Sequence, residues 1–206
     1  MIEFSLSKSK RKALPEAVTV DGNAFSINPS FRTILKALRL ISDEQILDAH
    51  KAGMLLRMFY GETIPDNVDE AIKAFQWFVR RGDNEEPKQD GKPPVFDYEQ
   101  DASEVYSSFY TLYSIDLIES EMHWWKFSAL LDGAFRSECP LSDKIKLRTI
   151  DPSKCENAKE VQEAQESIKI ETNFTREEKR NRKRLEEVLT GGGDVVAALE
   201  ALKHGK

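Results

Sequence analysis

The chain has 206 residues, with 36 acidic and 30 basic side chains and a formal net charge of -6. This length suits one domain of ordinary size with room for appendages, and the acidic balance argues against a dedicated nucleic-acid-binding protein, which usually carries a basic excess. No apolar run approaches the roughly 20 residues of a membrane span, and Met1–Val18 lacks the apolar core of a signal peptide, so we expect a protein that is neither secreted nor in contact with a membrane.

The first thirty residues are predicted to form antiparallel β structure. Two alternating runs, with Val18 and Val20 on one and Phe25 on the other, are joined by Asp21-Gly22-Asn23. An Asp-Gly pair between such runs is typical of a hairpin, because glycine tolerates a positive φ. Glu3–Ser7 is a candidate third strand, so the sequence predicts a hairpin or a small three-stranded sheet.

After the hairpin, apolar residues follow helical spacing and predict three helices. The pair Ser42 and Gln45 has the form of a capping box, which predicts the opening of the second helix, and this helix runs to about Tyr60. Asp66 is the expected N-cap of the third helix. Gly82 is the expected left-handed stop at its end.

The polar, glycine- and proline-rich residues 82–97 predict a flexible loop between two halves of one core. Asp101 is then expected to cap a helix over residues 102–119, followed by a helix over residues 122–135 and a short mixed segment at 141–150. The predicted fold class is therefore mainly α: a helical domain with a small N-terminal antiparallel sheet.

Apolar residues thin out after residue 153, which predicts a core domain over residues 1–153 and a charged helical extension over residues 154–206. A glycine run at 191–193 predicts a hinge inside this extension. The helix after the hinge is too short to be stable alone in water, so we expect it to dock on the chain's own core, on another copy or on a partner. Its candidate partner-binding residues are Val195, Val196, Leu199 and Leu202.

His123 is the histidine that raises the question of catalysis, because carboxylates lie close to it in the sequence. Acid–base catalysis needs groups that converge within hydrogen-bond reach in a pocket. On a helix, Glu119 would lie four residues from His123 and could meet it, but nothing else completes a nucleophile or an oxyanion site. A histidine packed beside Trp124 or Trp125 is the favoured alternative, and we expect no catalytic residue and no enzyme activity.

No metal site and no cofactor are expected from the other reactive side chains. Cys139 and Cys155 lack metal-type spacing and are interpreted as free thiols. An acidic group near residue 100 is interpreted as solvating a helix start, since helix N-termini favour acids. Its members are Asp97, Glu99, Asp101 and Glu104.

The basic run at residues 179–184 is bracketed by glutamates, with Arg182 four residues before Glu186. Such spacing allows ion pairs along one helix face. A solvated helix is therefore favoured over a contact with RNA or DNA, and we expect no nucleic-acid partner.

The combination of LPEAVTVDGNAFSINPSFR, a helix ending YSIDL, the segment HWWKFSALLDG and a later TREEKRNRKRLEEV resembles the gene-product-fifteen family of tailed phages and prophages. The resemblance covers most of the chain, and the loop at 82–96 and the tail after Gly191 match least. The residues that carry the family signature are Tyr113, Ile115, Asp116, Leu117, His123, Trp124, Phe127 and Leu131.

What the resemblance implies is a role in tail morphogenesis, because members are encoded just ahead of the tape measure gene, the place usually held by tail assembly chaperones. A chaperone of this kind would bind the tape measure protein and the major tail protein in the cytoplasm of the host bacterium. A homo-oligomer of this chain is a further possibility. The alternatives are a structural component of the tail, such as a completion or baseplate protein, and, less favoured, a nucleic-acid-binding regulatory module.

Overall fold

The computed structural model describes residues 14–43, 46–84 and 94–171. Their fold is mainly α, with seven α-helices and one two-stranded antiparallel sheet, which confirms the predicted fold class. The chain divides into two units, residues 1–168 and residues 169–206. The four candidate partner-binding residues, the glycine run and the basic run lie outside the described residues.

The hairpin consists of β1 (Ala17–Val20) and β2 (Asn23–Ser26), with Val20 paired to Asn23. The loop is therefore only Asp21-Gly22, and both residues have a positive φ, 48° and 80°. Positive φ at both central positions defines a type I′ turn, whose twist matches that of the flanking strands. The candidate third strand at Glu3–Ser7 lies outside the described residues.

The helices of the first half are α1 (Phe31–Ser42), α2 (Asp48–Tyr60) and α3 (Val68–Val79). Two predicted helix starts are wrong by a short distance. Ser42 is the last residue of α1, where its hydroxyl donates to the carbonyl of Leu38 at 3.1 Å, so it does not cap α2. Asn67, not Asp66, caps α3, because its side-chain oxygen accepts the N–H of Glu70 at 3.3 Å.

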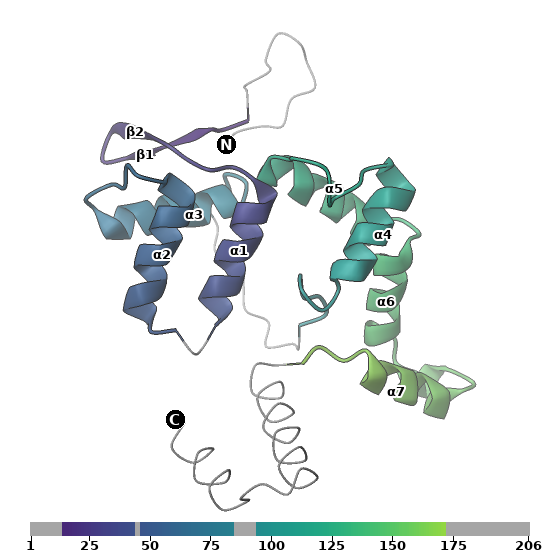
Figure 1. Ribbon diagram of the computed structural model, residues 1–206. Helices are drawn as coiled ribbons and strands as arrows, with labels where there is room; N and C mark the ends of the chain where they lie inside the picture. Colours follow the sequence, from purple (N-terminus) through teal and green to yellow (C-terminus); the bar gives the residue numbers. More distant parts are fainter. Residues whose placement is uncertain (1–13, 44–45, 85–93, 172–206) are drawn as a thin grey trace, which may run out of the picture. The chain divides into compact units, whose positions relative to one another are not determined.

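The second half contains α4 (Ala102–Tyr113), α5 (Trp124–Arg136), α6 (Pro140–Thr149), the short 3₁₀ helix η2 (Pro152–Lys154) and α7 (Ala158–Ser167). Helix α5 contacts α1 on one side and both α4 and α6 on the other. It therefore connects the α1–α3 group to the α4–α6 group, as Figure 1 shows.

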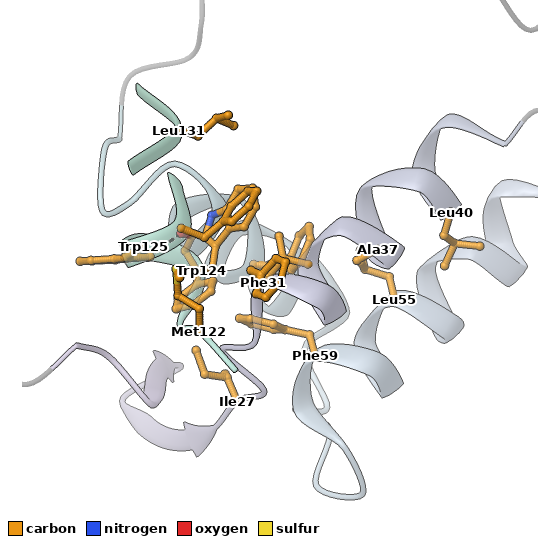
Figure 2. Packing of buried hydrophobic residues seen from close by; sticks show 14 of the residues in the cluster. Ile27, Phe31, Ala37, Leu40, Leu55, Phe59, Met122, Trp124, Trp125 and Leu131 are labelled. Atoms are coloured by element: carbon orange, nitrogen blue, oxygen red, sulfur yellow. Dashed lines mark hydrogen bonds between the residues drawn. The ribbon is translucent and has the colours of Figure 1, made fainter. Parts of the chain in front are cut away.

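Aromatic side chains from both groups form the centre of the core. Phe127 of α5 stacks on Phe31 of α1, with ring centroids 4.8 Å apart, and on Phe109 of α4 at 5.2 Å. Trp124 stacks on Phe127 at 5.7 Å. Figure 2 shows Phe31, Phe59 and Trp124 within one buried cluster. Burial of large aromatic rings is the main favourable contribution to this arrangement.

Candidate functional site: the signature segment and its anchors

The segment between α4 and α5 is a compact turn. The sequence predicts helix as far as Glu119, but α4 ends at Tyr113, and Ser114 takes a left-handed φ of 54°. Asp116 Oδ1 accepts the N–H of Ile118 at 2.8 Å and that of Glu119 at 3.4 Å. An aspartate that bonds nearby backbone N–H groups in this way offers the chain an alternative to a helix, so the predicted helix is six residues too long.

Arg32 of α1 holds this turn in place. Its guanidinium donates to the carbonyls of Leu117 at 2.7 Å, Ile118 at 2.6 Å and Ser120 at 3.3 Å. Carbonyls outside regular structure need such a donor when water cannot reach them. One arginine on α1 therefore fixes a turn that lies more than eighty positions later in the sequence.

His123 is the N-cap of α5, which begins at Trp124 and not at Met122 as the sequence predicts. Its Nδ1 accepts the N–H of Trp125 at 3.0 Å, so the ring proton is on Nε2, which donates to the carbonyl of Pro15 at 3.1 Å. Because both ring nitrogens are hydrogen-bonded, His123 links the backbone of Trp125 to the backbone of Pro15.

The contacts of His123 do not support an acid–base pair with Glu119. Glu119 lies in the turn and not one helical turn below, so the spacing argument for a contact with His123 does not hold. The His123 ring instead lies against Phe78 at 5.5 Å between centroids. Burial lowers the pKa of His123, and the carbonyl of Pro15 and the charge of Glu16 oppose this shift. The neutral form is therefore favoured.

The two tryptophans of the signature segment cap the end of α3. Trp124 Nε1 donates to the carbonyl of Val79 at 2.9 Å, and Trp125 Nε1 donates to the carbonyl of Phe78 at 2.8 Å. The last carbonyls of a helix have no intrahelical partner, so the indoles satisfy groups that burial would otherwise penalise. Gly82 has the expected left-handed conformation, with a φ of 86°, and a Cβ there would meet the Trp125 ring at 3.4 Å.

Among the signature residues, Tyr113, Trp124 and Phe127 make the contacts that hold α1, α3, α4 and α5 together. Tyr113 of α4 donates its hydroxyl to the carbonyl of Leu130 in α5 at 2.8 Å. The buried members are Leu117, Trp124, Phe127 and Leu131, and the half-buried members are Tyr113, Ile115, Asp116 and His123.

A second cluster, which the sequence interpretation missed, lies between the start of α4 and α6. Asp101 is fully buried, so the view that it solvates a helix start is wrong. Its carboxylate accepts two hydrogen bonds from the guanidinium of Arg148, at 2.6 and 2.8 Å, and contacts Lys144 Nζ at 2.9 Å. Lys144 also contacts Glu104 at 2.9 Å. The sequence analysis identified the acidic members Asp101 and Glu104 but not their basic partners Lys144 and Arg148, which lie four residues apart on α6.

Burial alone would raise the pKa of Asp101, but the hydrogen bonds from Arg148, from the backbone of Asp97 and from Lys144 outweigh it and lower the pKa. Arg148 also donates to the carbonyls of Val95 at 3.0 Å and Ile168 at 2.7 Å. The buried ion cluster therefore joins the segment before α4, helix α6 and the residue that follows α7.

The family model described as Bacteriophage Gp15 protein matches residues 11–174 of this chain. The chain belongs to the bacteriophage Gp15 protein family. A search of the curated proteins and a search of the solved structures each found no match.

The region shared with the Gp15 family contains the hairpin, helices α1–α7, the signature segment and the buried ion cluster. The segment at 175–188, which also contributed to the resemblance, and the candidate partner-binding residues at 195–202 lie beyond the matched range. The family model therefore covers the anchors described above and leaves residues 195–202 out.

Two further findings concern the described residues alone. Within them, no group of three or more His, Cys, Asp or Glu side chains is arranged to hold a metal ion. None of the helices in this part of the chain has the length and apolar character needed to cross a membrane.

Proposed function

We propose that this Gp15-family protein is a tail assembly chaperone that binds the tape measure protein and the major tail protein in the cytoplasm of the host. The observation that carries the proposal is membership of the bacteriophage Gp15 family over residues 11–174. The resemblance places the genes of this family just ahead of the tape measure gene, and tail assembly chaperones usually occupy that place.

The contacts of the signature residues support a binding role over a chemical one. His123, the histidine closest to a catalytic pattern, is a helix cap, and the indole N–H groups of Trp124 and Trp125 are used on the end of α3. At the same time, apolar side chains remain exposed on the described helices and turns, as expected where a helical partner binds. They include Ile41, Leu47, Met54, Tyr110 and Ile118.

Co-expression with the tape measure protein of the same genome tests the proposal. We expect the tape measure to remain soluble, to be recovered by affinity pull-down with this protein, and to form a complex that contains many copies of it by light scattering. A tape measure that aggregates equally with and without this protein contradicts the chaperone role. Stoichiometric amounts in purified mature particles would instead favour a structural component of the tail, because chaperones leave before the particle is complete.

A further inference from the structure

We propose that one face of α4 and the turn after it bind a helical protein segment rich in lysine or arginine. This tyrosine–acid surface consists of Tyr106, Tyr110, Asp116, Ile118 and Glu119. It rests on the proposed function for the identity of the partner, the tape measure protein, and on the structure alone for the chemistry of the contact.

The five residues are linked by ring stacking and by the contacts of Asp116. Tyr106 and Tyr110 lie one helical turn apart on α4, and their rings stack with centroids 6.3 Å apart and planes at 19°. The pKa of Tyr106 is raised, first by loss of contact with water, then by the charge of Asp116 and a hydrogen bond to its side chain, and further by Glu119. Asp116 in turn bonds the backbone of Ile118 and Glu119.

The outer side chains of this surface remain largely exposed. Tyr110 is 58% exposed and Ile118 is 68% exposed, although the backbone of Ile118 is held by Arg32. Tyrosine is one of the residues in which protein interfaces are enriched. Because the turn is already fixed through its backbone, these side chains are presented on a rigid support.

The charge of the surface indicates which chemical class of partner it can bind. The carboxylate of Glu119 forms no ion pair or hydrogen bond with any residue in the described ranges. Arg32 donates to three carbonyls of the turn, lies 3.8 Å from the carboxylate of Glu121 and lies over the ring of Phe31. Tyrosine faces and carboxylates both attract ammonium and guanidinium groups, whereas they repel the phosphates of nucleic acids. The patch therefore matches an amphipathic helix with a basic flank.

A designed peptide tests the chemistry directly. The probe is a labelled amphipathic helix of about 20 residues, long enough to be helical, with leucine on one face and lysine on its flank, and binding to the full chain is followed by fluorescence anisotropy. We expect binding that weakens at about 1 M salt, where the screening length is about 3 Å. A peptide with glutamate in place of lysine should bind far more weakly, and equal binding of the two peptides overturns the proposal.

Substitution of the surface locates the contact. The variant Tyr110→Ser, Ile118→Ser, Glu119→Lys should raise the Kd for the lysine peptide about tenfold or more, as for residues near the centre of an interface. The control, Val68→Ser, Ile64→Ser, Glu62→Lys, changes three exposed side chains elsewhere, including one glutamate to lysine, and should leave the Kd unchanged. Unchanged thermal melts show that both variants remain folded. Equal binding by the surface variant and the wild type overturns the proposal.

The same variants separate this inference from the proposed function. If the surface variant keeps the tape measure soluble as well as the wild type does, the surface is not the contact and the chaperone role stands. If the lysine peptide binds at the surface while the wild-type protein fails to solubilise the tape measure, the contact stands and the chaperone role is wrong. Loss of solubilisation in the surface variant alone supports both.

Discussion

Replacing Arg148 with methionine should strongly destabilise the protein, because it removes two hydrogen bonds to a buried carboxylate. The Asp101 carboxylate is fully buried and the Arg148 side chain is 7% exposed. Removing one partner of a buried ion pair typically costs about 3–5 kcal/mol, because the other charge stays buried without compensation. Lys144 still contacts Asp101 at 2.9 Å, so we expect the lower end of this range, about 3 kcal/mol.

The double variant Asp101→Asn, Arg148→Met shows whether this loss comes from the unpaired carboxylate. Asparagine keeps an oxygen that can accept the backbone N–H of Asp97, now bonded to Asp101 Oδ2 at 3.0 Å, but it carries no charge. The loss of stability in the double variant should therefore be smaller than the sum of the two single losses. The difference should be about 0.5–3 kcal/mol, the range for residues in one ion-pair network.

Urea denaturation followed by tryptophan fluorescence measures these differences, because Trp124 and Trp125 lie in the core and report its unfolding. The control is Arg136→Met, the same exchange at an exposed position of α5, which should stay within about 0.5 kcal/mol of the wild type. A free energy of unfolding for Arg148→Met equal to that of the control, or strictly additive single losses, would refute the reasoning.

Three further predictions concern the signature segment. Trp124→Ala should lower the free energy of unfolding by about 3–5 kcal/mol, as for other buried large aromatics, and an unchanged thermal melt contradicts its place in the core. The lowered pKa of His123 means that the unfolded chain takes up the proton first as pH falls below about 6.5. In urea titrations, stability should therefore fall as the pH drops through about 6.5, the ordinary pKa of histidine. The fall should be steeper than in His123→Asn, which can still cap α5, and parallel curves contradict this. Gly133→Ala would place a Cβ 2.6 Å from the hydroxyl of Tyr113 and should cost about 1–3 kcal/mol of stability. Gly53→Ala in α2, where a Cβ meets open space, should instead stabilise the protein by up to about 1 kcal/mol. Thermal melts that show the same sign of change for both variants refute the packing argument.

Local rules were sufficient where one short segment decides its own conformation. The Asp-Gly pair of the hairpin and the Gly82 stop of α3 are examples, because glycine adopts a positive φ without a steric penalty. The helix over residues 102–119 shows the limit of periodicity, since Ile115 and Leu117 continue an apolar pattern although the chain has already left the helix. What ends α4 is Asp116, whose side chain bonds backbone N–H groups two and three residues later.

Long-range partners could not be predicted from spacing. Asp101 is the correct N-cap position of α4, but its side chain bonds Arg148, 47 residues away, and not its own helix. The role of Arg32 is similar, because its three acceptors are backbone carbonyls that carry no residue-specific signal. Both contacts depend on how α1, α4 and α6 pack, which no local pattern encodes.

Buried and exposed residues in and around the signature segment call for different tests of partner binding. Its buried members hold helices together, so their loss will abolish partner binding by unfolding the protein, whether or not they touch a partner. Tyr110, Ile118 and Glu119 lie between and beside these residues, and their side chains are exposed. Our inference therefore predicts that substitutions in this exposed set weaken partner binding and leave the melting temperature unchanged.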